Sequence, residues 1–493
     1  MTKRTRLGLV TAAALLLFSS TSARAEEPVP PPPSGSVAPA EAAPAPAPPL
    51  RTEDPRQNAQ LAFVPLATEG SSVPPGKNYK TTVYGFAEFD AFWDSTQSFI
   101  DASSNSSIAR PDLIPAGKNG QTQFTARNSR IGLKMEAAPY GDFQAAAQAE
   151  MDFYANPAPG ATEGAIYTNA PVRMRHYFLT LKSPYVDVLA GQYHDLFAWG
   201  GKGLYPNSVA FLALFGEIYH RNPQLRLSKT FKSNAVDVEI AAAAVRPVGR
   251  VGQIPDGEAG IRLAVNNWRG VRAQGSGPPD TGPLQIGVSG IGRYFRVNPF
   301  SQMVGDYLTA TGWGVAGNIV VPIVPATPAN MRNAVTMTGE VTVGSGIADL
   351  YSGLSGGAKY PALQNPMLLL TPPVYAANLD PGIVAFDAAG NLHTINWRAF
   401  VAGLQYHLPV GAGDRLWVSG IFSGIQSTNL ASITPPGSQP YIWTKGYYYD
   451  GNLFVAITPA VQVDFSYQYM QQTYGDGVVA KNHRAEFAMH YFF

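Results

Sequence analysis

The residues whose types and spacing point to a function are charged ones. They occupy polar positions in segments where apolar and polar residues alternate. The carboxylates at such positions are Glu88, Asp90, Glu150, Asp152, Glu239 and Glu340, and the arginines are Arg127, Arg130, Arg173, Arg175 and Arg226. On a lipid-facing strand each arginine would cost about 2–4 kcal/mol at the bilayer midplane, which favours a water-filled interior for these charges. Opposed rows of charge there would set a transverse field that selects ions and zwitterions. The alternative is that Arg–carboxylate pairs only fill and stiffen a wall.

The spacing between the arginines determines which of them can lie on the same face of a strand. Arg173 and Arg175 differ by two and share one face of a strand, because strand side chains alternate. Arg127 and Arg130 differ by three and cannot both point inward in an unbroken strand. We therefore expect one of them at a bulge or a strand end.

No catalytic arrangement stands out. The seven histidines are scattered, and His194 next to Asp195 is the one suggestive pair, more ordinarily explained as a polar strand end. Histidine spacing matches no H-E-x-x-H pattern, no Gly-rich loop could cradle a phosphate, and the absence of cysteine removes thiolate nucleophiles and ligands. We expect no enzyme, no metal and no cofactor.

The elements that must position these charges are period-two strands. Within residues 481–493, Phe487, Met489 and Tyr491 fall on an apolar face, while Arg484 and Glu486 fall on a polar one. Such alternation recurs from residue 81 to the terminal Phe493 and gives about 16 strands. Short turns at 139–142, 183–185, 409–414 and 458–460 alternate with long loops at 99–120, 197–222, 345–392 and 427–440. This pattern predicts an all-β fold, a transmembrane antiparallel β-barrel of about 16 strands over residues 81–493.

Composition agrees with a barrel. Charged residues are 14% of 493, and no run approaches 18 apolar residues after the first 25, so helical spans are excluded downstream. A net charge of +1 argues against nucleic-acid binding.

The first 80 residues differ from the rest. Residues 1–25 have the basic start, apolar run and Ala23-Arg24-Ala25 site of a signal peptide. Residues 26–80 are Pro/Ala-rich and predict a largely disordered periplasmic segment, a spacer or a tether that contacts the cell wall. Export, alternating strands and absent cysteine indicate a Gram-negative outer membrane, with its lipid as one partner.

The segment 197–222 carries Lys202, Glu217 and Arg221 around an apolar patch from Val209 to Phe215. Such a patch has to be covered, and folding the loop into the barrel would cover it and narrow a pore. The alternative is that the patch forms a contact between monomers. Loop 345–392 is also long enough to cover a pore.

The chain resembles the DcaP-like group of trimeric outer-membrane porins, within the general Gram-negative porins. The resemblance is carried by motifs at 75–76, 83–86, 90, 127–133 (RNSRIGL), 150–153 (EMDF), 173–176 (RMRH), 190–193 (AGQY) and 221–226 (RNPQLR), and by Phe493. It implies a 16-stranded homotrimeric channel for small hydrophilic solutes, narrowed by its third extracellular loop. That group is associated with negatively charged solutes such as dicarboxylates. The Pro/Ala-rich start departs from the helical N-terminal segment common in the group.

The leading hypothesis is therefore a passive channel lined by arginines and carboxylates. A structural or adhesive barrel with an occluded lumen is the alternative. A barrel hydrolase would require a Ser–His pair near the outer rim.

Overall fold

The computed structural model describes residues 79–98, 107–155, 171–210, 215–247, 254–272, 279–297, 307–352, 383–387, 389–410, 415–433, 439 and 442–493. The predicted signal peptide 1–25 and the Pro/Ala-rich segment up to residue 78 lie outside these ranges.

The chain forms strands and a few short helical turns. The strands are β1 (Lys80–Asp94), β2 (Gln121–Thr125), β3 (Arg130–Glu136), β4 (Gln144–Asp152), β5 (Arg173–Lys182), β6 (Asp187–His194), β7 (Arg221–Phe231), β8 (Val236–Val245), β9 (Asp256–Val271), β10 (Thr281–Val297), β11 (Leu308–Val324), β12 (Val335–Ser345), β13 (Val384–Phe386), β14 (Leu392–Thr394), β15 (Asn396–His407), β16 (Leu416–Ser427), β17 (Trp443–Ala456), β18 (Val461–Tyr474) and β19 (Val479–Phe492). The helical turns are α1 (Pro115–Lys118), η1 (Phe197–Trp199), η2 (Ala348–Leu350) and α3 (Leu430–Ile433). In this part of the chain no helix is long and apolar enough to cross a membrane.

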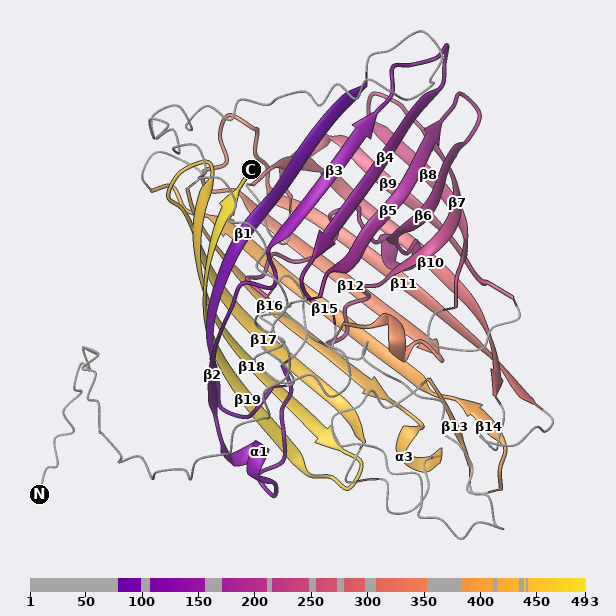
Figure 1. Ribbon diagram of the computed structural model, residues 1–493, viewed down its shortest axis with the longest axis vertical. Helices are drawn as coiled ribbons and strands as arrows, with labels where there is room; N and C mark the ends of the chain where they lie inside the picture. Colours follow the sequence, from indigo (N-terminus) through magenta and orange to yellow (C-terminus); the bar gives the residue numbers. More distant parts are fainter. Residues whose placement is uncertain are drawn as a thin grey trace, which may run out of the picture. The chain divides into compact units, whose positions relative to one another are not determined.

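The strands close into an antiparallel barrel (Figure 1). Closure is made by β19, which pairs with β18 on one side and with β1 on the other, in register Phe86↔Phe492 to Asp94↔Arg484. Both β2 and β3 pair with β1, one beyond the other, so they form one interrupted strand and the barrel has 16 positions. β13 and β14 form a separate hairpin. The predicted barrel of about 16 strands is confirmed.

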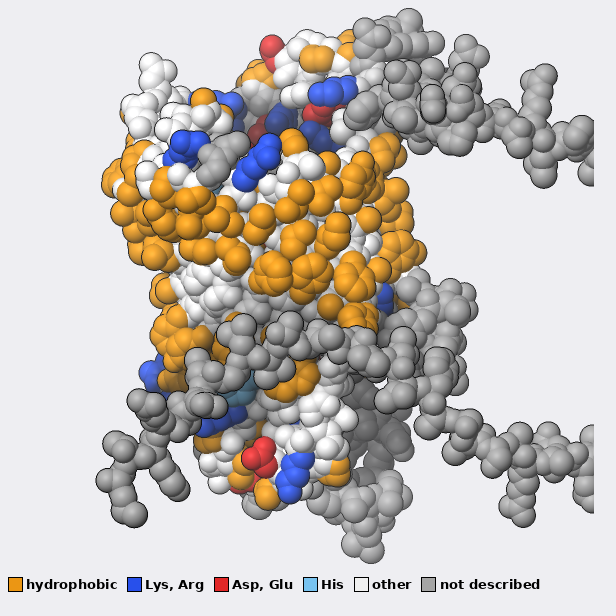
Figure 2. Space-filling model, turned by 90° about the vertical axis from the view of Figure 1, so that its left-hand side faces the viewer, with side chains coloured by type: hydrophobic (Ala, Val, Ile, Leu, Met, Phe, Trp, Pro, Cys, Tyr) orange, Lys and Arg blue, Asp and Glu red, His pale blue; other side chains and the backbone are white. Residues whose placement is uncertain are grey.

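Side chains alternate across the wall as the period-two pattern predicts. In β19, Met489 and Tyr491 are exposed outward, while Arg484 and His490 are buried inside. The outward hydrophobic side chains form a belt with charged residues near its two edges (Figure 2). A belt of this kind matches the hydrocarbon layer of a bilayer.

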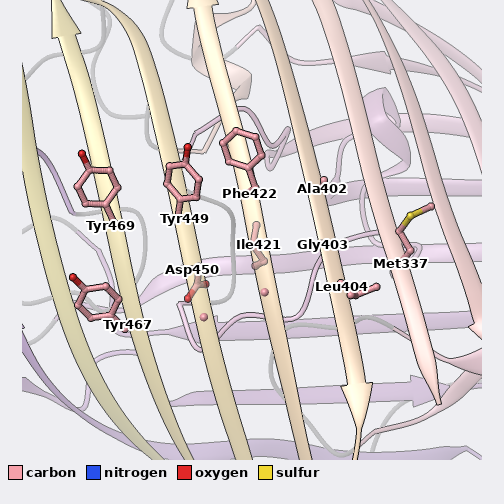
Figure 3. A pocket seen from close by; sticks show the side chains of 12 residues that line it. Met337, Ala402, Gly403, Leu404, Ile421, Phe422, Tyr449, Asp450, Tyr467 and Tyr469 are labelled. Carbon is pink, nitrogen blue, oxygen red and sulfur yellow. The ribbon is translucent and has the colours of Figure 1, made fainter. Parts of the chain in front are cut away.

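The outer surface is hollowed over β12 and β15–β18. In Figure 3, Phe422, Tyr449 and Tyr469 stand side by side on neighbouring strands. Phe422 stacks on Tyr449 with ring centroids 4.7 Å apart. Gly420 and Gly451 also line this groove, and they leave room between the rings because they carry no side chain.

Regular pairing is interrupted at several places, two of which are β11 against β12 near Pro322 and β17 against β18 near Trp443. Residues 126–129 separate β2 from β3, so the second strand predicted from the sequence is interrupted. In β5 the register against β4 shifts between Glu150 and Met151, and in β9 it shifts against β10 where Pro283 pairs with Arg269 but Leu284 pairs with Val265. Such bulges re-aim side chains that regular alternation would place elsewhere.

Candidate functional site

An arginine–carboxylate cluster lines the inside of β3, β4 and β5. Glu150 and Asp152 of β4 both point inward. Arg173 donates two hydrogen bonds to Asp152, at 2.9 and 2.6 Å. Arg175 bridges the two acids, 2.7 Å from Glu150 and 2.9 Å from Asp152. Arg130 adds an ion pair to Glu150 at 3.7 Å. Two carboxylates thus hold three guanidinium groups in place.

The bulge in β5 creates this geometry. Glu150 pairs with His176 and Met151 with Met174, so Arg175 has no register partner on β4. Arg175 and His176 are consequently both buried inside, although they are adjacent in sequence. Beyond the bulge Leu179 points outward. Without the bulge, Arg175 and Leu179 would point to the same side of the strand, because they are an even number of residues apart.

Tyr219 and Arg221 extend the positive region. The Tyr219 hydroxyl accepts hydrogen bonds from Arg221 at 3.1 Å and from Arg175 at 3.4 Å. Burial alone would raise the pKa of Tyr219, but Arg221, Arg175 and Arg130 outweigh it and lower the pKa to about 8. Arg221 makes no ion pair with any carboxylate in the described part of the chain.

Two further predicted arginines bind backbone oxygens. Arg226 of β7 donates to the carbonyl of His194 at 2.5 Å and to the side chain of Gln224 at 2.9 Å. Arg127 lies in the break between β2 and β3 and donates to the carbonyls of Phe153 at 3.0 Å and Ala155 at 2.9 Å. The break removes the conflict with Arg130 that the spacing of three posed.

The predicted carboxylates Glu88, Asp90 and Glu340 are inward but buried, with 3%, 0% and 5% of their surface exposed. Glu88 accepts a hydrogen bond from Asn128 at 2.6 Å. Glu340 accepts one from the backbone N–H of Ile218 at 2.8 Å and one from Asn318 at 2.8 Å. Glu340 therefore fastens the segment 195–220 to β12.

That segment is fastened to the inside of the barrel at several other places. Near its start, the backbone N–H of Leu196 donates to Glu258 of β9 at 2.7 Å. Midway, Ser208 donates to Asp450 of β17 at 2.5 Å. Lys202 pairs with Glu239 of β8 at 3.0 Å.

The predicted loop residue Glu217 is buried, and its carbonyl accepts a hydrogen bond from the N–H of Ser352 at 2.8 Å. Residues 211–214, within the predicted apolar patch, lie outside the described residues. So does the greater part of loop 345–392.

Several inward residues were not singled out from the sequence. Arg262 of β9 binds Glu239, and Arg484 pairs with Asp94 at 2.8 Å. Alternation within β19 already places Arg484 on the polar face, so its inward position could have been predicted from the sequence. Arg262 lies in a region of weaker alternation, where only pairing with β8 reveals it.

The histidine–acid pair has structural partners. Asp195 accepts a hydrogen bond from Asn222 at 2.8 Å, and His194 lies 4.9 Å from the ring of His176. The described residues hold no group of three or more histidine, aspartate or glutamate side chains placed to bind a metal.

Comparison with solved structures gives the same architecture. The crystal structure of the outer membrane channel DcaP of Acinetobacter baumannii matches with a TM-score of 0.59 at 17% identity, covering 84% of this chain and 97% of that one. An anion-selective porin from Comamonas acidovorans matches with a TM-score of 0.49 at 8% identity, covering 84% of this chain and 100% of that one. No protein-family model and no curated protein matches the chain in sequence.

The closed antiparallel barrel of 16 strands, its apolar belt and its charged interior define a transmembrane β-barrel with a porin-like fold. Within that class the chain has the fold of the DcaP channel.

Proposed function

We propose that the protein is a passive outer-membrane channel that favours small hydrophilic anions. The observation that carries the proposal is the difference in exposure between two arginines of the cluster and its two carboxylates. The Arg173 side chain is 36% exposed and that of Arg130 is 17% exposed, whereas those of Glu150 and Asp152 are 7% and 0% exposed; Arg175, which bridges the two acids, is buried like them at 5%. A passing ion would therefore meet guanidinium groups, because the neighbouring carboxylates lie beneath them.

The segment 195–220 would form the constriction in this channel. Its hydrogen bonds to Glu258, Asp450 and Glu340 join three parts of the wall far apart in sequence. Lys202 lies within this segment and Arg221 follows directly after it, so positive charge lies beside the proposed constriction, whereas Glu217 is buried. Rings and rows of charged side chains at a narrow point set ion selectivity.

Assembly and export complete the proposal. The DcaP-like resemblance supports a homotrimer, and the first 25 residues support export through a signal peptide. Residues 26–80 would then form a periplasmic spacer whose proline content keeps it extended. A more specific role for the same residues would be contact with the cell wall.

The test is single-channel conductance and reversal potential of the purified protein in a planar bilayer under a salt gradient. The proposal expects current steps in groups of three and a reversal potential of the sign set by anions. A cation-selective channel would keep the porin and refute the anion preference. A folded but silent protein would refute the channel.

A structural barrel with an occluded lumen is the second candidate, and one observation favours it. The segment 195–220 and the loops near η2 pack hydrophobic side chains inside the barrel, including Phe215 against Trp443 at 5.3 Å. Such a core could close the lumen altogether. The same bilayer measurement separates the two candidates, since the occluded barrel carries no current.

A further inference from the structure

A row of cationic side chains lies on the outer surface of β15–β19. Arg398 pairs with Gln426 and Gln426 pairs with Lys445, so these residues of three neighbouring strands stand in one line across the sheet. Lys481 of β19 lies one line closer to the middle of the wall, where it pairs with Gln471. The opposite ends of these strands carry the short turns 408–415 and 457–460. The row therefore lies at the end of the barrel that faces away from the short turns.

No carboxylate on the same face offsets these charges. The acidic residues of β15–β19 are all buried on the inward face, and they are Asp450, Asp464 and Glu486. Arg398 donates a hydrogen bond to Gln426 at 3.0 Å, and Lys445 lies 4.7 Å from the centroid of the Tyr447 ring. Within the described residues, Arg398, Lys445 and Lys481 make no ion pair, so the row offers three positive charges to an anionic group.

The groove over β12 and β15–β18 opens on the same face, with a volume of about 560 Å³. Its floor is formed by Gly420 and Gly451, which pair with each other on β16 and β17. Figure 3 shows Leu404 and Tyr467 on either side of this floor. A Cβ at Gly451 would meet nothing within 4 Å, so an apolar group has room to enter between the rings.

The separation between the row and the groove floor matches one leaflet of a bilayer. Gln426 and Gly420 are six residues apart on β16, which is about 20 Å along the strand. Because strands of membrane barrels tilt by about 40°, this length spans a depth of about 15 Å. One leaflet contributes about 15 Å to the hydrocarbon core. A lipid with its headgroup at the row would therefore reach the groove floor with the end of an acyl chain.

The spacing of the cations indicates the chemistry of the headgroup. Arg398, Lys445 and Lys481 lie on alternate strands, β15, β17 and β19, so neighbouring cations are about 10 Å apart across the sheet. Phosphate is a group that arginine and lysine bind with charge-assisted hydrogen bonds. Two phosphates at that separation require a wide headgroup between them, such as a disaccharide.

We propose that this face of the barrel binds a bisphosphorylated glycolipid. Its phosphates contact Arg398, Lys445 and Lys481, and one of its acyl chains fills the groove above Gly420 and Gly451. Long loops mark the extracellular end of such barrels, so the lipid belongs to the outer leaflet. The site lies on the outside of the barrel wall, so the inference goes beyond the proposed channel function and does not depend on it.

The experiment is native mass spectrometry of the full-length protein, folded in detergent and freed of lipid, with three lipids added in turn. Lipid A has two phosphates on a disaccharide, monophosphoryl lipid A has the same acyl chains and one phosphate, and cardiolipin has two phosphates joined by a glycerol. The charge variants are Arg398→Gln and Lys445→Gln, and Gly451→Leu fills the groove. Arg415→Gln is the matched control, because Arg415 is exposed at the other end of β16.

We expect lipid A to bind about fivefold more tightly than monophosphoryl lipid A or cardiolipin, as one additional contact between a cation and a lipid phosphate implies. Arg398→Gln and Lys445→Gln should each lower the affinity for lipid A about fivefold. Gly451→Leu should weaken both forms of lipid A equally, because their acyl chains are the same. Arg415→Gln should bind like the wild type.

Equal affinity for lipid A and either of the other two lipids would overturn the inference, as would unchanged binding in both glutamine variants. The same spectra report the number of protein chains in each particle. If Gly451→Leu changes that number and leaves lipid A binding intact, the face is a contact between copies of the chain and the inference is wrong.

Discussion

Neutralising Arg221 should lower the anion preference of the pore without unfolding the barrel. Arg221 makes no ion pair within the described residues, so no carboxylate is paired with its charge, unlike that of Arg175. An ion passing about 6 Å away in water gains about 0.7 kcal/mol from one unit charge. Screening at 0.1 M salt, with a Debye length of about 10 Å, leaves about 0.4 kcal/mol.

That energy changes anion occupancy about twofold, and cation occupancy about twofold in the opposite direction. The ratio of anion to cation permeability should therefore fall about fourfold in Arg221→Gln. The assay is the reversal potential across a planar bilayer with 0.1 M salt on the dilute side. Arg415→Gln is the comparison, because it removes the same unit charge at an exposed residue next to the start of β16 and should leave the ratio close to the wild-type value. An Arg221→Gln channel with the wild-type reversal potential would refute the reasoning.

Three other outcomes are expected. Arg175→Gln should lower the free energy of unfolding by about 3–5 kcal/mol, since it leaves buried carboxylates short of a partner, as measured by urea unfolding in lipid vesicles. Raising the pH from 7 to 9 should ionise Tyr219, whose pKa is about 8, and the new negative charge should reduce anion preference; Tyr219→Phe should lack this change in reversal potential. Gly201→Ala should destabilise more than Gly477→Ala by about 1–3 kcal/mol. Both glycines have positive φ, but a Cβ at Gly201 would lie 2.5 Å from a tyrosine hydroxyl, whereas one at Gly477 would meet nothing within 4 Å; equal costs in chemical unfolding would contradict this.

The sequence alone predicted the barrel, because strand alternation is local. Each residue of β19 faces lipid or lumen according to its parity, and thirteen residues suffice to show the pattern. The alternation of short and long connections is likewise written along the chain. The inward placement of Glu150, Asp152 and Arg173 followed from these two signals.

The tertiary structure decided which charged side chains point inward and which partners they meet there. The bulge that turns Arg175 and His176 to the same side depends on how β5 pairs with β4, and the break that frees Arg127 from Arg130 depends on pairing with β1. Arg262 gained its role only through the neighbouring Glu239 on β8. Pairing register is a property of two strands, so one strand's sequence does not contain it.

By itself, the sequence determined the fold class, the strand number and the faces of most strands, because a period of two is fixed by the backbone. Only the tertiary structure decided that Glu88, Asp90 and Glu340 are buried and that the segment 195–220 is fastened inside the barrel. Burial and loop attachment depend on side chains hundreds of residues apart, such as Ser208 and Asp450. Contacts at that separation form only when the barrel closes.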